Sequence, residues 1–328
     1  MIGIGVIGAG RIGQIHATNL YRHPDADLRY IVDVLGSAAS ELADACDAQT
    51  ASIETLLGDD SIHAVVIASS TDTHTDLVCA AAQARKAIFC EKPLDLDVST
   101  AQRSLDAVAE HKVLMCLGFN RRHDPSFDRL KQEVAGGNIG NVEVVSITSR
   151  DPSPPPIDYI ARSGGLFRDM MIHDFDMGRW LLGEEPVEVY AAGSVLVDTN
   201  IGDAGDVDTA VATLRTASGR LCQITNSRRC SYGYDQRIEV FGSDGMARAD
   251  NQRETQVEIA ASDGFSRDPV LHFFLQRYAD AYRIQLDKFL RAVNGENLDL
   301  PGGDDGLRAL QLADAAQRSC DEGRPIAV

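Results

Sequence analysis

Residues 2–13 read IGIGVIGAGRIG, and this stretch decides the fold of the first part of the chain. The apolar run Ile2–Ile7 predicts a buried strand, and Arg11–Arg22 predicts the helix that follows it. Between them the pattern G-x-G-x-x-G places three glycines in the turn from strand to helix. Strand, glycine-rich turn and helix, in this order, form the local structure that binds a dinucleotide.

The three glycines have separate roles in such a turn. Gly8 allows the turn to close, Gly10 lets the backbone approach a pyrophosphate, and Gly13 lets the helix lie close to the strand. The N-terminus of the helix offers free N–H groups and a partial positive charge to phosphate oxygens. We therefore expect the phosphates of a dinucleotide beside this turn, with Arg11 and Ile12 among the contacts.

An acidic residue follows at the distance that ribose recognition needs. Asp33 lies in the second expected strand, Leu28–Val34, twenty residues past Gly13. A carboxylate there accepts hydrogen bonds from the ribose hydroxyls, and no basic residue follows it to meet a 2′-phosphate. The pattern favours NAD over NADP. A glycine-rich turn with a surface aspartate is the simpler alternative, but it leaves the order of strand, glycines, helix and acid unexplained.

The composition limits the classes of function. The chain has 328 residues, which is enough for two domains, and a formal net charge of −18. So acidic a surface repels nucleic acid and anionic lipid, and therefore favours a small neutral substrate. The seven cysteines are scattered without C-x-x-C pairs, and neither a signal peptide nor an apolar run of bilayer length is visible. These features predict a cytoplasmic protein without a metal site.

The first 120 residues alternate apolar strands with helices, which predicts a parallel, doubly wound sheet. The expected strands are Ile2–Ile7, Leu28–Val34, Ala64–Ser69, Ala87–Glu91 and Val113–Phe119, and the expected helices are Arg11–Arg22, Ala38–Cys46, Ser52–Leu57, His74–Arg85 and Ser99–His111. Residues 1–120 are thus expected to form an NAD-binding Rossmann domain, with ligands beyond the carboxyl ends of the strands. Further cofactor contacts are expected at Ser69, Ser70, Thr71, His74 and Glu91.

After Phe119 the pattern changes, and we expect a second α/β domain over residues 121–328. Its expected elements are the helix Phe127–Val134, the strand Val142–Ser149, the irregular proline-rich segment Asp151–Ile157, the helix Asp169–Leu182, the strands Val187–Val197, Thr209–Thr216, Arg220–Arg228 and Gln236–Phe241, and the helices Phe273–Val293 and Gly306–Arg318. Consecutive strands joined by turns predict a large, mostly antiparallel open sheet. One face of such a sheet often forms a subunit interface, and the final helices could pack back on the first domain.

Three residues suit the oxidation of an alcohol. Lys92 follows a buried strand in Glu91-Lys92-Pro93, where a cation can stabilise a developing alkoxide, although a solvated lysine is the simpler alternative for this residue taken alone. The X-Pro bond after it could be cis. Asp169 and His173 stand four residues apart on one expected helix, which suits a general base oriented by a carboxylate. The same spacing fits equally well a helix cap at Asp169 and a structural histidine.

Four further polar residues are candidates for binding the hydroxyl groups of a substrate. Asn120 and Arg122 lie where the two expected domains join, and Asp151 begins the proline-rich segment. Tyr234 offers a phenolic hydroxyl to the same kind of ligand.

Taken together, these motifs resemble the glucose-fructose oxidoreductase / inositol dehydrogenase / rhizopine-catabolism family, over nearly the whole chain. The resemblance rests on residues 8–13, 68–74, 91–93, 118–127, 149–152, 164–176, 205–209 and 233–237. The stretches R-D-P, G-D-V-D-T and G-Y-D-Q-R point more narrowly to its inositol 2-dehydrogenase branch. Met171 departs from the pattern, because related sequences often carry threonine there.

The resemblance implies a Rossmann domain joined to a C-terminal α/β domain with an open sheet, and usually a homotetramer. It implies NAD-dependent oxidation of myo-inositol to 2-keto-myo-inositol, with Lys92, Asp169 and His173 as the catalytic set. Another inositol isomer or an aldose as substrate stays open, because pocket residues decide the choice. A non-catalytic NAD(H)-sensing module is an alternative of a different class, but it would not need the three catalytic residues together. Nothing specific in the chain supports a scaffold.

Overall fold

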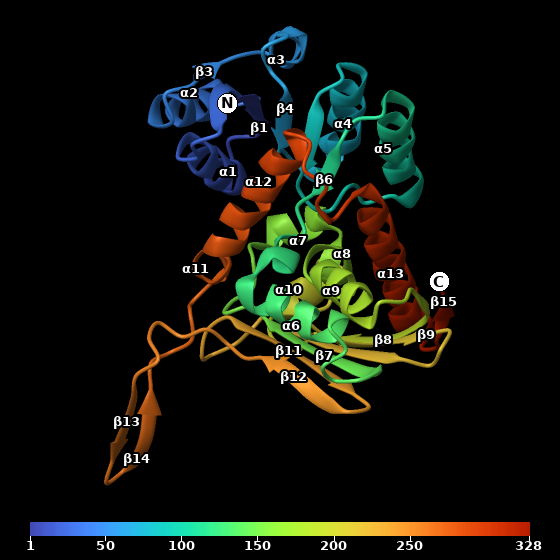
Figure 1. Cartoon of the computed structure of the whole chain (residues 1–328). Helices are drawn as coiled ribbons and strands as arrows, with labels where there is room; N and C mark the ends of the chain where they lie inside the picture. Colours follow the sequence, from blue (N-terminus) through green and yellow to red (C-terminus); the bar gives the residue numbers. More distant parts are fainter. The chain divides into compact units, whose positions relative to one another are not determined.

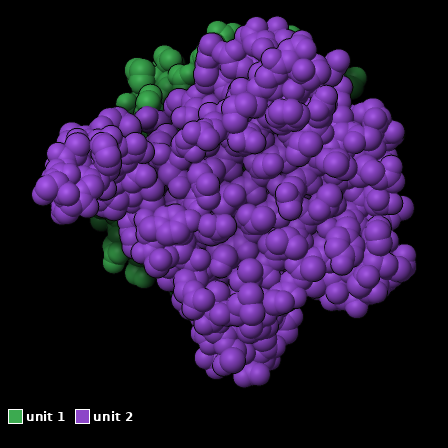
Figure 2. Space-filling view, turned by 90° about the horizontal axis from the view of Figure 1, so that it is seen from below, with its two compact units in different colours: residues 1–123, 281–310 green, residues 124–280, 311–328 purple.

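The computed structural model describes residues 1–328, which divide into two compact units (Figures 1 and 2). Unit 1 consists of Met1–His123 and Ala281–Leu310, and unit 2 consists of Asp124–Asp280 and Gln311–Val328. Each unit is built on one large sheet. Within the whole chain, no helix combines the length and the apolar character needed to cross a membrane.

Unit 1 contains a six-stranded parallel sheet in the order β3-β2-β1-β4-β5-β6. Its strands are β1 Ile2–Ile7, β2 Ala26–Val32, β3 Gln49–Thr50, β4 Ala64–Ile67, β5 Ala87–Cys90 and β6 Met115–Leu117. The strand order reverses between β1 and β4, and ligands of such sheets bind at this switch point. The doubly wound sheet predicted from the sequence is confirmed. Four strands end one or two residues earlier than predicted, so that Asp33, Ser69 and Glu91 lie in the loops that follow them.

The helices of unit 1 pack on this sheet and close its apolar core. They are α1 Arg11–Tyr21, α2 Gly36–Ala45, α3 Ile53–Gly58, α4 His74–Gln83, α5 Val98–His111 and most of α12 Ala279–Val293, with the short 3-10 helices η1 Thr71–Thr73 and η2 Asn120–His123. Ser52 and Asp97 cap the N-termini of α3 and α5 through their side-chain oxygens. Phe289 of α12 is fully buried in the same core as Ile4 and Phe89, so a segment late in the chain completes unit 1.

Unit 2 contains a seven-stranded mixed sheet in the order β12-β11-β7-β10-β9-β8-β15. Its strands are β7 Val142–Arg150, β8 Pro186–Ser194, β9 Thr209–Thr216, β10 Leu221–Ser227, β11 Asp235–Gly242, β12 Gly245–Ala249 and β15 Ile326–Ala327. Only β7 and β10 pair in parallel, and all other neighbours are antiparallel. This confirms the mostly antiparallel sheet. The sequence analysis missed β12 and β15, and also the two-stranded hairpin of β13 Glu258–Ala261 and β14 Gly264–Arg267.

The helices of unit 2 cover one face of its sheet, as Figure 1 shows for α6 to α10. They are α6 Pro125–Ala135, α7 Ile157–Ser163, α8 Gly165–Asp169, α9 Ile172–Leu182, α10 Thr199–Asp203 and α11 Phe274–Arg277, and the unit boundary falls within α13 Gly303–Glu322. Along β9 the residues Ala210, Ala212 and Leu214 are buried while Val211 between them is exposed. The alternation is typical of a sheet with one covered face and one open face.

The predicted helix Asp169–Leu182 is wrong, because the structure divides it. α8 ends at Asp169 and α9 begins at Ile172. The N–H of Met171 donates to the carbonyl of Leu166, and the N–H of Asp174 donates to the carbonyl of Met171, so the regular i→i−4 bonds are interrupted. The bond from Met171 reaches five residues back instead of four, which takes residues 170–172 off the path of a continuous α-helix. The predicted helix Phe273–Val293 is likewise divided, at Tyr278.

Candidate functional site

The turn after β1 has the geometry that a bound pyrophosphate needs. Gly8 has a φ of +107°, and a Cβ there would lie 2.5 Å from the carbonyl of Ala68. A Cβ on Gly13 would lie 1.9 Å from the carbonyl oxygen of Gly8, so the helix and the turn are in direct backbone contact. A Cβ on Gly10, in contrast, would meet no atom within 4 Å, and no side chain caps the N-terminus of α1. Open space in front of uncapped N–H groups fits the phosphates of a dinucleotide.

We expect Gly10→Ala to weaken NAD binding without weakening the fold. The added methyl group meets no protein atom but projects into the space in front of the α1 N-terminus, so the KM for NAD should rise about 10–100-fold, the equivalent of 1–3 kcal/mol of overpacking. The matched variant Gly13→Ala forces a methyl group against a backbone carbonyl and should lower the melting temperature. Steady-state kinetics and thermal unfolding separate the two effects. An unchanged KM in Gly10→Ala would contradict this placement of the phosphates.

Asp33 is held beside the glycine-rich turn by backbone groups. Its Oδ2 accepts a hydrogen bond from the N–H of Ala9 at 2.6 Å, and its Oδ1 accepts one from the N–H of Leu35 at 2.8 Å. Each carboxylate oxygen has a second lone pair, so both can still accept a hydroxyl hydrogen. The carboxylate is therefore placed and chemically suited for the ribose of an adenosine.

The segment Glu91-Lys92-Pro93 follows β5 and is anchored by a buried hydrogen bond between Glu91 and His16. Oε1 of Glu91 lies 2.7 Å from Nε2 of His16 on α1, and both side chains are buried. Oε2 of Glu91 accepts the N–H of Lys92 at 3.3 Å, and a Cβ on Gly118 would lie 2.7 Å from the same oxygen. The Lys92-Pro93 peptide bond is cis. Lys92 is half-buried, and its backbone N–H is linked through Glu91 to His16 on α1.

His74 joins the loops after β4 and β5. Its Nδ1 lies 2.8 Å from the carbonyl oxygen of Pro93, and its Nε2 lies 3.2 Å from that of Ser69. Burial lowers the pKa of His74, so the ring is neutral and donates through one nitrogen, for which Pro93 gives the shorter bond. Through this bond His74 holds the segment that carries Lys92, and its ring also lies against the loop that carries Ser69. Ser70 and Thr71, on the more accessible side of the same turn, are better placed to reach a ligand.

In unit 2, Asp169 and His173 lie at the junction of α8 and α9. Oδ1 of Asp169 accepts the hydroxyl of Tyr159 at 2.9 Å, and Oδ2 lies 3.6 Å from Nη1 of Arg228. The alternative that Asp169 caps a helix is not supported, because Met171 is the N-cap residue of α9 and no side chain caps it. The prediction that the two residues share a face of one regular helix is wrong. They are instead the last residue of α8 and a first-turn residue of α9, both half-buried.

The four residues expected to bind hydroxyl groups are distributed over both units. In unit 1, Asn120 and Arg122 lie on η2, where Arg122 donates to Asp305 at 2.7 Å and the buried Oδ1 of Asn120 has no hydrogen-bond partner. In unit 2, Asp151 follows β7 and is half-buried, and the buried ring of Tyr234 packs edge-to-face on Phe273 and Tyr278. A free carbonyl oxygen on a buried side chain suits a hydroxyl donor, which makes Asn120 the best supported of the four.

Three residues near these candidates were missed by the sequence analysis. His16 supports Glu91, Tyr159 donates to Asp169, and Arg228 forms an ion pair with Asp169. Of the three, only Arg228 could have been found from the sequence, because an arginine at the end of a buried strand needs an acidic partner. Across the chain, no group of three or more His, Cys, Asp or Glu side chains is arranged to hold a metal ion.

Comparison with known proteins matches both halves of the chain to domains of one oxidoreductase family. Residues 2–119 match the description "Oxidoreductase family, NAD-binding Rossmann fold", and residues 131–328 match "Oxidoreductase family, C-terminal alpha/beta domain". The chain is 50% identical to inositol 2-dehydrogenase of Rhizobium meliloti over 324 residues, covering 99% of this chain and 98% of that protein.

Two solved structures cover all of this chain and 99% of their own chains. A myo-inositol dehydrogenase from Corynebacterium glutamicum is 42% identical, with a TM-score of 0.95. A scyllo-inositol dehydrogenase from Lactobacillus casei, with bound NAD(H) and scyllo-inositol, is 28% identical, with a TM-score of 0.91.

Proposed function

The chain belongs to the oxidoreductase family that joins an NAD-binding Rossmann fold to a C-terminal α/β domain, and from this premise we propose that it oxidises myo-inositol to 2-keto-myo-inositol with NAD. The observation that carries the proposal is the 50% identity to inositol 2-dehydrogenase along nearly the full length of both proteins. The geometry of residues 8–13 and of Asp33 supports NAD as the cofactor.

NAD, when bound, accepts a hydride from the carbon atom that carries the reacting hydroxyl group. The residues of this chain supply the rest of the reaction. In the proposal the imidazole of His173 removes the hydroxyl proton, and Asp169 orients that imidazole and stabilises its protonated form. The ammonium group of Lys92 donates a hydrogen bond to the reacting oxygen while negative charge develops on it. The alcohol thereby loses one proton and one hydride and becomes a ketone.

The remaining candidates bind and orient the two ligands. Asp33 accepts hydrogen bonds from the ribose hydroxyls of the cofactor. Ser70 and Thr71 contact the cofactor from the turn after β4. His74 and Glu91 support the site indirectly, by hydrogen bonds to the backbone of Pro93 and Lys92. On the substrate, the amide of Asn120 and the side chains of Arg122, Asp151 and Tyr234 hydrogen-bond the hydroxyls that do not react.

The proposal is tested with a panel of polyols and both nicotinamide cofactors. The reaction is measured by the absorbance of the reduced cofactor. We expect the highest kcat/KM for myo-inositol with NAD, and little turnover with NADP. A preference for scyllo-inositol is the second candidate, favoured by the likeness to the scyllo-inositol dehydrogenase from Lactobacillus casei. Tight NADH binding without turnover of any polyol would contradict the enzymatic function and favour an NAD(H)-sensing module.

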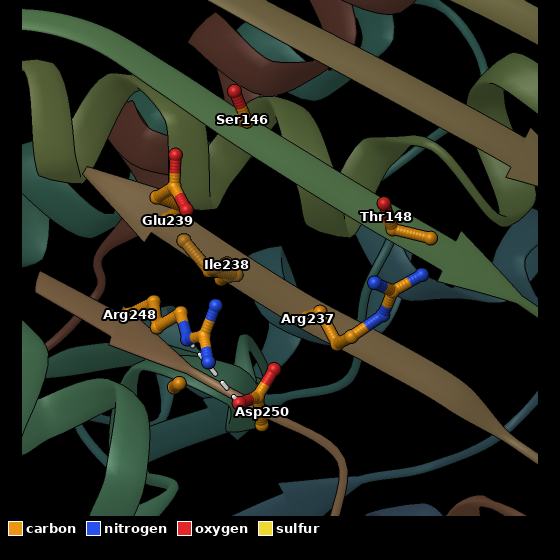
Figure 3. Close-up of a pocket in the computed structure, with 8 residues that line it drawn as sticks. Ser146, Thr148, Arg237, Ile238, Glu239, Arg248 and Asp250 are labelled. Atoms are coloured by element: carbon orange, nitrogen blue, oxygen red, sulfur yellow. Dashed lines mark ion pairs between the residues drawn. The ribbon is translucent and has the colours of Figure 1, made fainter. Parts of the chain in front are cut away.

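We further propose that the protein is a homotetramer whose subunits meet through the open face of the unit 2 sheet. This broad face is seen in Figure 2. It exposes apolar side chains on three neighbouring strands, Tyr190 on β8, Val211 on β9 and Leu221 on β10, and an adjoining set of this kind marks a candidate interaction surface. A shallow hollow of about 180 Å³ lies on this face over β7, β11 and β12 (Figure 3), lined by Thr148, Arg237 and other polar side chains.

The β13–β14 hairpin supports the same proposal. It extends away from the sheet of unit 2 in Figure 1, and Phe265 at its end is 78% exposed. A two-stranded hairpin is marginally stable in water without further packing. A second subunit that covers the hairpin would provide that packing.

We expect Val211→Asp to dissociate the tetramer. The substitution places a charge in the middle of the exposed face of β9, where burial against a partner would leave the carboxylate unpaired. The matched control is Tyr21→Asp, at a residue of α1 in unit 1 that is exposed to a similar extent, 53% against 44% for Val211. Light scattering after size exclusion should show a lower mass for Val211→Asp only. An unchanged tetramer in Val211→Asp, or a monomeric wild type, would contradict this interface.

We also propose that the protein resides in the cytoplasm, a reducing compartment. All seven cysteines are unpaired, and five of them are buried. Unpaired buried thiols are typical of proteins that reside where disulfides do not form.

A further inference from the structure

Arg228 is the largest side chain that is fully buried, and it lies between two carboxylates. It follows β10, and its backbone N–H donates at 2.8 Å to the carbonyl of Asp208, the residue before β9. Its Nη1 lies 3.6 Å from Oδ2 of Asp169, and its Nη2 lies 3.4 Å from Oδ2 of Asp206. A guanidinium group stays charged at any relevant pH, so both carboxylates are needed to compensate its burial.

Asp206 fixes the other end of the helix that carries Asp169. Its Oδ1 accepts the N–H of Leu166 at 2.9 Å, in the first turn of α8. Gly165 has a φ of +83°, and a Cβ there would lie 2.8 Å from the same oxygen, so α8 starts in direct contact with this carboxylate. Asp206 therefore holds the beginning of α8, and Arg228 holds the carboxylate at its end.

The oxygens of Asp169 are both engaged within unit 2. Tyr159 from α7 donates to Oδ1, and Arg228 faces Oδ2. His173 follows in the first turn of α9, Asp206 stands behind Arg228, and the neighbouring Arg168 is directed to Asp314 of α13. A positive charge in this position decreases the tendency of a nearby imidazole to take up a proton.

We propose that Arg228, held in place by Asp206, is a positioning residue: it fixes the orientation of Asp169 and places a positive charge near His173, and thereby sets the pH range over which His173 acts as a base. This inference rests on the proposed function. It assigns a role to the G-D-V-D-T stretch, Gly205–Thr209, which the catalytic set itself does not use. Arg228 and Asp206 touch neither the substrate nor the cofactor in this assignment.

The two residues make opposite predictions for the pH profile of kcat/KM. The acidic limb of the profile is the pH range in which kcat/KM falls because His173 becomes protonated. Arg228→Met removes a positive charge near this base, so His173 should take up its proton more readily and the acidic limb should move to higher pH by roughly half a unit or more. We also expect kcat to be about tenfold lower. Asp206→Asn keeps an acceptor for Leu166 but removes the negative charge behind Arg228, so the limb should move to lower pH. Arg228→Lys keeps the positive charge but loses the planar guanidinium group that faces Asp169 and Asp206 at the same time. We therefore expect a lower kcat and an acidic limb at the same pH as in the wild type.

The experiment measures these profiles with NAD and myo-inositol on the full-length protein. The position of the limb does not depend on the fraction of protein that is active, so partial misfolding of a buried variant does not obscure it. Arg168→Met is the matched control, because it removes an arginine next to Asp169 in the sequence that pairs elsewhere, and its profile should match the wild type.

The outcomes separate this inference from the proposed function. Opposite shifts in Arg228→Met and Asp206→Asn support it, because a purely structural role would lower activity in both without displacing the limb in opposite directions. Wild-type profiles in both variants, alongside an active wild type and an inactive His173→Ala, would overturn the inference alone. A wild type that does not oxidise any polyol would overturn the proposed function instead.

Discussion

Replacing His173 with alanine is expected to lower kcat by about 10²–10⁴-fold, the usual contribution of a positioned general base. The imidazole is the group proposed to take the hydroxyl proton, and no other histidine lies at the α8–α9 junction. The KM for NAD should stay near the wild-type value, because the glycine-rich turn and Asp33 belong to unit 1. Steady-state formation of NADH gives kcat, and NADH fluorescence gives the cofactor affinity directly.

The control for this variant is His272→Ala, at an exposed histidine of the same unit. It should retain wild-type kcat and show that loss of a histidine as such has no effect. Asp169→Asn should also lower kcat strongly, because an amide can neither fix the same tautomer nor stabilise an imidazolium ion. Near-normal turnover in His173→Ala would show that another group accepts the proton.

Replacing Lys92 with methionine is expected to lower kcat by about 10²–10³-fold, the cost of removing one donor to a developing oxyanion. Methionine keeps the length and the apolar stem of lysine but cannot donate a hydrogen bond. The anchoring of the segment should survive, because the Glu91–His16 pair and the bond of His74 to Pro93 do not involve the lysine side chain. Measurements with myo-inositol deuterated at the reacting carbon should show an isotope effect at least as large as that of the wild type.

The exposed Lys112 provides the control, and Lys112→Met should be indistinguishable from the wild type. Combining Lys92→Met with His173→Ala gives a stricter test. If both side chains act on the same hydroxyl group, the double variant should lose much less than the product of the two single losses. Fully multiplicative losses, or near-wild-type turnover in Lys92→Met, would contradict a shared site of action.

Most of the Rossmann half could be predicted from the sequence because its signals are local. The apolar run Ile2–Ile7, the glycine pattern after it and the alternation of strands and helices depend on residues close together in the chain. The candidate cofactor residues followed from the same logic, since ligands bind after the carboxyl ends of parallel strands. The residues themselves also identified Lys92, Asp169 and His173 as candidates for the chemistry, and the resemblance strengthened that assignment.

The supports of these residues could not be predicted in the same way. The Glu91–His16 pair joins residues 75 positions apart, and Arg228, just after β10, contacts Asp169 from 59 positions further along the chain. The helix expected across Asp169 and His173 failed for a related reason. Spacing describes a regular helix, whereas here the backbone hydrogen bonds around residues 170–172 leave the i→i−4 pattern and divide the helix into two.

The order of residues along the chain thus determined which side chains are candidates for the chemistry and most of the strands and helices of the first unit. Tertiary structure alone decided that a segment near the C-terminus completes the first unit, that a buried guanidinium group stands against the carboxylate at the end of α8, and which face of the second sheet stays open. The physical reason is that turns, strands and helices respond to their immediate neighbours. Contacts between distant segments form only when the burial of apolar surface brings those segments together.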